Sequence, residues 1–68
     1  MRRVPAEGTD VIVHYLATRE AGTVEVVHDG GTAVTVVTEH GELLRFQLMA
    51  TGAYQTADRT CRLKFPAP

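Results

Sequence analysis

Short apolar runs alternate with polar positions along most of the chain, and glycine interrupts these runs about every ten residues. In residues 42–48, for example, single polar residues separate Leu44, Phe46 and Leu48, and residues 60–65 alternate in the same way. An alternation with a period of two is typical of strands with one buried face, and no segment keeps an apolar stripe at helical spacing. We therefore predict an all-β fold, with strands at residues 10–17, 22–28, 32–38, 42–49, 53–56 and 59–65.

The turns between the predicted strands favour one register. The register that aligns the apolar faces pairs Val26 with Val34, Val36 with Leu44, and Leu48 with Tyr54. It leaves three-residue loops at residues 29–31, 39–41 and 50–52, and each of these loops ends in glycine. Three-residue hairpin loops need a left-handed backbone at their last position, which glycine adopts without steric cost. Apolar faces and turn residues therefore predict the same meander of hairpins.

The meander closes into a small five- to six-stranded antiparallel barrel if the last predicted strand pairs with the first. At this point the chain resembles the SH3-like barrel superfold. The resemblance lies in the opening segment GTDVIV at residues 8–13, the segment GTVEV at residues 22–26, two tight hairpins and a short last strand. It implies a fold and no particular family. An open, strongly bent sheet that dimerises through its free edge is the rival architecture.

Length and composition fit one small domain. The chain has 68 residues, of which 44% are hydrophobic, and its net charge is −1. We expect one domain over residues 1–68, with a flexible N-terminal arm at residues 1–8 and a tail at residues 66–68. No stretch approaches the roughly 20 apolar residues that span a bilayer, so we expect no membrane partner. The one cysteine, Cys61, cannot form an internal disulfide, and we expect a cytoplasmic protein.

No group of side chains indicates an enzyme, a metal site or a cofactor. His28 and His40 flank the predicted strand 32–38 and would lie about 20 Å apart at roughly 3.3 Å per residue, too far to share a metal. Cys61 falls on the apolar face of its strand, and the chain contains no serine. The carboxylates are scattered through turns and strand ends, without a pair suited to acid–base catalysis. We therefore predict a non-enzymatic protein that holds no cofactor.

Two surfaces are candidates for binding. Apolar residues on the side opposite the predicted core form the predicted contact face: Val27, Val37, Leu43 and Met49. Such a patch usually marks contact with another protein, so our first hypothesis is self-association or binding to a larger protein, through this face or an unpaired strand edge. Self-association would also stabilise a chain this short.

Basic residues near the two ends of the chain form the predicted basic edge: Arg2, Arg3, Arg59, Arg62 and Lys64. They would meet if the first and last strands are neighbours, and such a cluster could follow a phosphate backbone. Tyr15 is the one aromatic residue that the alternation leaves facing outward, where a base could stack on it. Nucleic-acid binding through this edge is the alternative function. The simpler interpretation is that these charges solvate an outer face and protect an edge strand.

Overall fold

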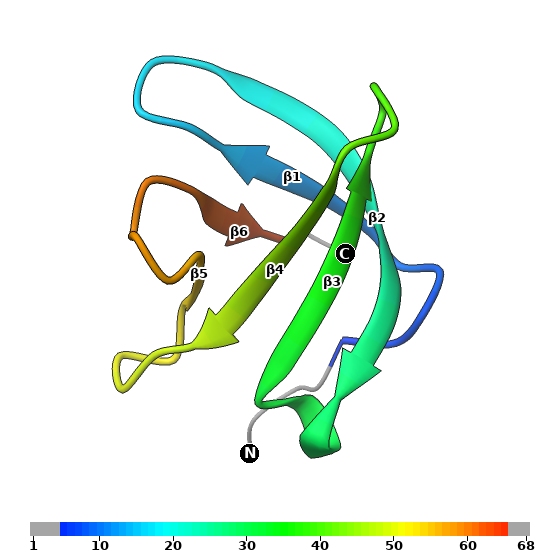
Figure 1. Ribbon diagram of the computed structural model, residues 1–68, viewed down its shortest axis with the longest axis vertical. Helices are drawn as coiled ribbons and strands as arrows, with labels where there is room; N and C mark the ends of the chain where they lie inside the picture. The colour runs from blue at the N-terminus through cyan, green and yellow to red at the C-terminus, as the bar shows by residue number, and fades with distance from the viewer. Residues whose placement is uncertain (1–4, 66–68) are drawn as a thin grey trace.

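A computed structural model describes residues 5–65 as a closed antiparallel barrel of six strands (Figure 1). The strands are β1 (Asp10–His14), β2 (Arg19–His28), β3 (Ala33–Thr38), β4 (Leu43–Leu48), β5 (Tyr54–Gln55) and β6 (Arg62–Lys64). The only helical element among these residues is the single turn η1 (Asp29–Gly31). Each strand pairs with the next along the chain, so the all-β meander predicted from the alternation is confirmed.

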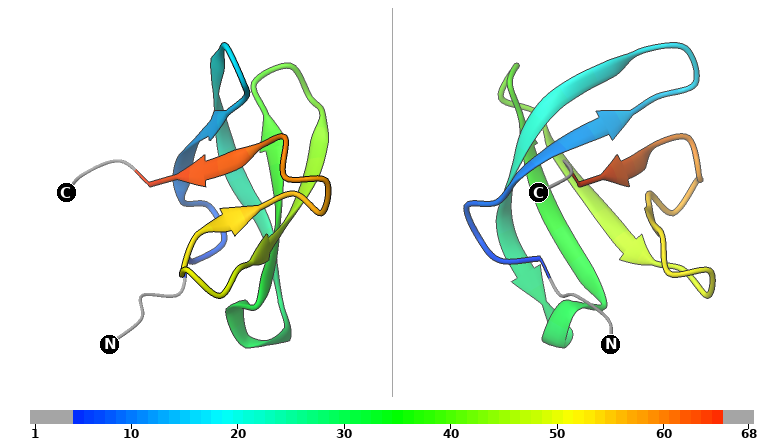
Figure 2. Two further views of the ribbon diagram at one scale, coloured as in Figure 1. Left: turned by 90° about the vertical axis from the view of Figure 1, so that its left-hand side faces the viewer. Right: turned by 180° about the vertical axis from the view of Figure 1, so that it is seen from behind.

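The last strand closes the barrel against the first. β6 pairs with β1 in the register Ile12 to Lys64, Val13 to Leu63 and His14 to Arg62. β6 also pairs with β5, so it lies between β1 and β5 (Figure 2, left). The predicted return of the last strand to the first is therefore confirmed, and the open bent sheet is excluded.

Two of the three predicted glycine turns have the expected geometry. In the β3–β4 turn, Gly41 has φ 84° and its N–H donates to the carbonyl oxygen of Thr38 at 2.8 Å. The β4–β5 turn repeats this arrangement, with Gly52 at φ 92° and a 2.9 Å bond from its N–H to the carbonyl of Met49. The predicted pairs that these turns fix, Val36 with Leu44 and Leu48 with Tyr54, are both observed.

The register between β2 and β3 differs from the prediction. A β-bulge between Val24 and Val26 adds one residue to β2, so that Val27, not Val26, lies opposite Val34. The predicted pair of Val26 with Val34 is therefore wrong. Because an extra residue reverses the alternation beyond it, Val26 is 38% exposed, whereas Val27 packs against the core.

The core is built from the inward faces of all six strands. Its fully buried side chains are Val11, Val13, Val24, Val34, Val36 and Phe46, and Tyr54, Cys61 and Leu63 complete it. Phe65, which the alternation placed inward, is 43% exposed, and its ring lies edge-on against Tyr54 at 6.1 Å between centroids. β6 ends at Lys64, so the pleat does not fix the direction of the Phe65 side chain.

The segment expected to be an N-terminal arm contacts the barrel where it is described. Pro5 is buried, and the N–H of Gly8 donates to the carbonyl oxygen of Val24 at 2.8 Å. The N–H of Val24 in turn donates to Thr9 at 2.9 Å, so this segment lies beside β2. Residues 1–4 and the predicted tail at residues 66–68 lie outside the described residues.

The ladder between β4 and β5 is short, with only two paired positions. Gln47 lies opposite Gln55 and Leu48 opposite Tyr54, while residues 43–46 pair with β3 alone among the described strands. The side of residues 43–46 that faces away from β3 is called the β4 edge below, and it runs along β4 toward the β3–β4 turn (Figure 1).

Candidate functional site

The backbone groups that point outward from the β4 edge can be identified from the hydrogen-bond pattern. The backbone N–H of Thr38 donates to the carbonyl oxygen of Glu42, and the N–H of Leu48 donates to the carbonyl oxygen of Thr32, each at 2.8 Å. Because hydrogen-bonded positions alternate along an antiparallel pair, the backbone groups of the even-numbered residues of β4 point toward β3. The N–H and C=O groups of Leu43 and Arg45 therefore point away from β3. Among residues 5–65, no strand pairs with them on that side. Four hydrogen-bonding groups are thus available to an added strand.

The predicted contact face is only partly assembled. Val37 and Leu43 lie directly opposite each other on β3 and β4, as the predicted register requires, and Leu43 is 64% exposed. Val27 is turned against the core by the bulge in β2, and Met49 is half-buried beyond the other end of β4. Leu43 therefore remains as the large apolar side chain that this surface exposes, and it lies on the β4 edge.

A shallow hollow adjoins Val37 where β2 carries a glycine. Its volume is about 420 Å³, and its walls include Ile12, Ala21, Val37 and Thr38. A Cβ atom on Gly22 would lie 2.8 Å from Cγ1 of Val36 and 3.0 Å from the carbonyl oxygen of Val37. Glycine is therefore required here for the close approach of β2 to β3.

The described part of the predicted basic edge comes together in a second hollow. Arg59, Arg62 and Lys64 line a space of about 360 Å³ and belong to β6 and the loop before it. The remaining lining residues are His14, Tyr15, Leu16, Gln55 and Thr60. This basic hollow has no carboxylate in its lining. Arg2 and Arg3 lie outside the described residues, so the edge can be followed only from Arg59 to Lys64.

The loop that carries Arg59 is tightly hydrogen-bonded. Asp58 Oδ1 accepts from the side chains of Thr56 at 2.7 Å and Thr60 at 2.8 Å. These bonds, first that from Thr56, hold the pKa of the Asp58 carboxyl below its usual value. Arg59 has φ 63°, a left-handed backbone that costs a side-chain-bearing residue about 1–2 kcal/mol. The loop therefore holds Arg59 in a strained conformation beside the basic hollow.

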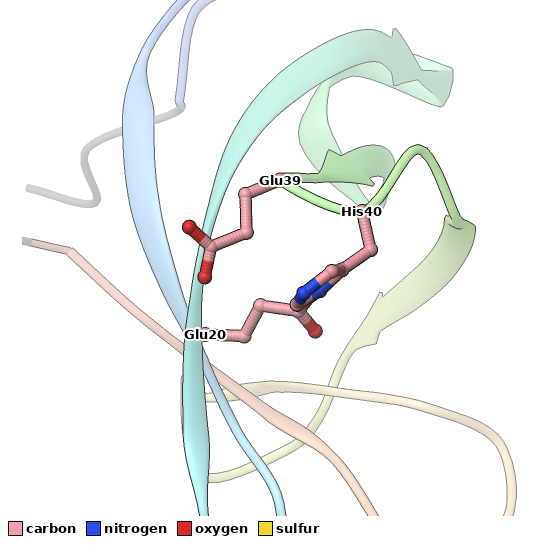
Figure 3. Close-up of side chains that lie close together, drawn as sticks. All are labelled: Glu20, Glu39 and His40. Atoms are coloured by element: carbon pink, nitrogen blue, oxygen red, sulfur yellow. The ribbon is translucent and has the colours of Figure 1, made fainter.

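Three polar side chains meet at the end of the barrel near the β3–β4 turn. Tyr15 donates a 2.7 Å hydrogen bond to Oε1 of Glu20, and Nδ1 of His40 bonds to Oε2 of the same carboxylate. The N–H of Glu39 donates to the carbonyl of Ala21 at 3.0 Å, which holds the turn over β2. Figure 3 shows the Glu20 carboxylate at the ring of His40, with the side chain of Glu39 extending beside them.

The hydrogen bonds among Tyr15, Glu20 and His40 shift the pKa values of all three side chains. The Tyr15 hydroxyl, and then the His40 imidazole, hold the pKa of Glu20 below its ordinary value. The hydrogen bond to Glu20 raises the pKa of His40, and the same carboxylate raises the pKa of Tyr15. The cluster therefore favours an anionic Glu20, a cationic His40 and a neutral Tyr15.

The same cluster has the donor types that could hold a metal ion. One ligand atom from each of Glu20, Glu39 and His40 lies within 4.8 Å of the other two. The sequence prediction compared His40 only with His28, whose Nε2 instead lies 2.9 Å from the hydroxyl of Thr35. It missed Glu20 because the predicted strand began at residue 22, whereas β2 begins at Arg19 and carries Glu20 alongside the β3–β4 turn.

Cys61 lies in the core and is 7% exposed, as its place in the alternation predicts. No helix within residues 5–65 has the length and apolar character needed to cross a membrane.

Comparison of the chain with protein-family models, with curated proteins and with solved structures gave no match, so the interpretation of these surfaces rests on their own geometry.

Proposed function

We propose that the protein is a non-enzymatic interaction module that binds a second copy of itself through the β4 edge. The observation that carries this proposal is the two-position ladder between β4 and β5, which leaves the outward backbone groups of Leu43 and Arg45 without a strand partner among the described residues. Adding a strand to such an edge is a common mode of protein recognition, because main-chain hydrogen bonds supply the affinity.

A two-fold axis beside Leu44 satisfies all four groups at once. In an antiparallel pair of β4 strands, Leu43 of one copy lies opposite Arg45 of the other, and each such pair exchanges two hydrogen bonds. Leu44 then faces Leu44 of the second copy at a non-hydrogen-bonded position, where side chains approach most closely. Both copies contribute the same residues, so the contact is self-complementary and closes as a dimer.

The side chains at the edge support this pairing. Leu43 is 64% exposed, and its burial in the dimer would remove apolar surface from water. Arg45 is also exposed, and its aliphatic stem would cover Leu43 of the second copy while the guanidinium stays in solvent. Since the contact uses backbone hydrogen bonds and apolar surface, its strength should depend little on salt.

Two further assignments belong to the proposal. The tight hairpins and the return of β6 to β1 support an SH3-like barrel as the fold of the module. A single cysteine that is buried and free supports a reducing, cytoplasmic setting.

The test is the mass of the protein in solution. Sedimentation equilibrium over a range of concentrations should give twice the chain mass of 7.4 kDa at the upper end, with little change between low and high salt. Arg45→Pro removes the outward N–H of Arg45 and no bond to β3, and edge strands tolerate proline at such positions. In a two-fold dimer it deletes two hydrogen bonds, so the dissociation constant should rise about tenfold or more.

Arg45→Ala is the matched control, because it removes the side chain and keeps the N–H. It should weaken the dimer much less than Arg45→Pro does. If Arg45→Pro also lowers the folded fraction by circular dichroism, Leu43→Lys tests the same edge by placing two charges in the contact. A protein that stays monomeric at all concentrations, or equal effects of Arg45→Pro and Arg45→Ala, would overturn the proposal.

A further inference from the structure

Strand registers align one row of polar side chains across the outside of the barrel. Gln47 on β4 lies opposite Gln55 on β5, which lies opposite Arg62 on β6. Arg62 in turn lies opposite His14 on β1, and His14 lies opposite Arg19 on β2. We call these five residues the cross-barrel row. With strands about 4.8 Å apart, the row extends about 19 Å over the surface.

Every member of the row faces outward. Gln47, Arg62 and Arg19 are exposed, while Gln55 and His14 are half-buried. Their neighbours toward the core, such as Val13 and Leu63, are buried, as the alternation of a strand requires. The row thus presents two guanidinium groups, an imidazole and two amides along one line, without a carboxylate.

The row passes through the basic hollow and extends beyond it on both sides. His14, Gln55 and Arg62 line that hollow together with Arg59 and Lys64. Arg19 lines an adjoining hollow on the far side of His14. Tyr15 and Leu16, of which Leu16 is 91% exposed, lie in the lining of both. Cationic groups and apolar surface therefore lie side by side along the same path.

We infer that this face binds single-stranded nucleic acid, laid across the strands along the cross-barrel row. Arg19, Arg59, Arg62 and Lys64 would contact phosphates, because guanidinium and ammonium groups are the usual partners of phosphate oxygens. The amides of Gln47 and Gln55 can bond to base edges, and the exposed Leu16 offers apolar contact to base faces. The ring of Tyr15, which the alternation placed outward, packs partly against the core, so only its edge borders this path. This inference does not depend on dimer formation, since the row and the β4 edge use different residues.

The chemistry favours a single strand over a duplex. Reading a duplex groove needs an element that enters it, such as a helix or a two-stranded ribbon. This face is instead formed by the curved sheet of β1, β6 and β5 (Figure 2, left). A row of about 19 Å matches the lower end of the range of about 4–16 nucleotides that small barrels bind. We therefore expect a short site of about four nucleotides.

Fluorescence anisotropy with a labelled twelve-residue oligothymidylate tests the inference. With four phosphate contacts, the logarithm of the association constant should fall with the logarithm of salt concentration at a slope of about −2.8. Arg19 lies at the far end of the row and outside the basic hollow. Arg19→Gln removes one of the four phosphate contacts, so it should reduce the slope to about −2.1. Arg62→Gln at the centre should reduce it as well and weaken binding most at low salt.

Arg45→Gln is the matched control, because Arg45 is an exposed arginine on β4 that lies outside the row and keeps its backbone N–H when substituted. Because Arg45 also belongs to the β4 edge, the parent and all variants are compared at a protein concentration where each is monomeric by sedimentation, and there Arg45→Gln should leave the slope unchanged. Equal effects of Arg45→Gln and Arg62→Gln would indicate diffuse charge attraction and overturn the inference. So would tighter binding to a duplex or to vesicles of anionic lipid than to the oligothymidylate, or no binding at 50 mM salt.

Discussion

The phenolic hydroxyl of Tyr54 donates a buried hydrogen bond to the carbonyl oxygen of Gly31, which joins β5 to the turn between β2 and β3. β5 has only two residues, and its ladder to β4 is equally short. The ring of Tyr54 packs in the core, and its hydroxyl supplies the hydrogen-bond donor for the buried carbonyl of Gly31. This one side chain therefore fixes the position of the shortest strand in the barrel.

Tyr54→Phe should destabilise the protein while keeping its core. The substitution leaves the Gly31 carbonyl buried without this donor, which costs about 1–3 kcal/mol. Urea denaturation measures the loss. Tyr15→Phe is the control, because it removes a phenolic hydroxyl whose partner, Glu20, keeps His40 as a second donor. A loss for Tyr54→Phe no greater than that for Tyr15→Phe would contradict this account.

Gly22→Ala should lower the free energy of unfolding by about 1–3 kcal/mol through overpacking. The new Cβ would lie 2.8 Å from Cγ1 of Val36, a fully buried β-branched side chain that cannot easily rotate away. Val36→Ala removes the atom that the new Cβ would meet. The double variant should therefore lose less free energy of unfolding than the sum of the losses in the two single variants. Additive losses would show that the close approach of β2 to β3 does not limit this position.

Arg59→Gly should raise the free energy of unfolding by up to about 1 kcal/mol, because glycine adopts φ 63° without the steric cost that arginine bears. Arg59→Ala is the control, since it removes the same side chain and keeps the unfavourable backbone. Thermal unfolding should place Arg59→Gly above both the parent and Arg59→Ala. If nucleic acid binds the basic hollow, both variants should bind it more weakly, so stability and affinity would change in opposite directions in Arg59→Gly.

The Glu20–His40 pair should stabilise the protein most in a window of mildly acidic pH. The pKa of His40 is raised above its ordinary value of 6.5, so its contribution is complete below pH 6.5 and is lost as pH rises through the folded-state pKa. The pKa of Glu20 is lowered from 4.5, so its contribution is present above pH 4.5 and is lost as pH falls. The pair should therefore contribute most between these two values.

Urea midpoints of the parent and of Glu20→Gln, measured from pH 4 to pH 9, should differ most in that window. Glutamine carries no charge but can still accept a hydrogen bond from Tyr15, so the substitution removes the ion pair and keeps that contact in neutral form. The Tyr15 contact does not involve His40, so the part of the difference that is lost as pH rises through the pKa of His40 belongs to the ion pair. Because His40 is largely exposed, added salt should reduce the difference. A difference that stays constant across the pH range would show that the pair is not coupled to folding.

Much of the barrel could be predicted from local pattern alone. The alternation around Phe46 and the glycine at position 41 each depend on neighbouring residues, and together they fixed the pairing of β3 with β4. The bulge at β2 could not be predicted in this way, because Val24, Val26 and Val27 are equally suited to either face. One extra residue there moved Val27 from the predicted contact face to the core.

The binding surfaces were predicted less completely, since they combine residues from distant strands. Arg59, Arg62 and Lys64 were found because they are close in sequence, and the structure adds His14 and Gln55 to them through pairing with β6. The β4 edge was missed as a specific site because the length of a ladder depends on how the barrel closes. Composition and alternation carry no information about that length.

The pairing of Ile12 with Lys64 also sets the order in which the protein can fold. The hairpins β2–β3 and β3–β4 join residues close in sequence, so they can form early and at small entropic cost. The closing pair joins opposite ends of the described chain, and the entropy lost in forming so long a loop must be offset by contacts made at the same moment. We therefore expect the docking of β6 to limit the folding rate, and the hydrophobic interior to remain accessible to water until that strand arrives.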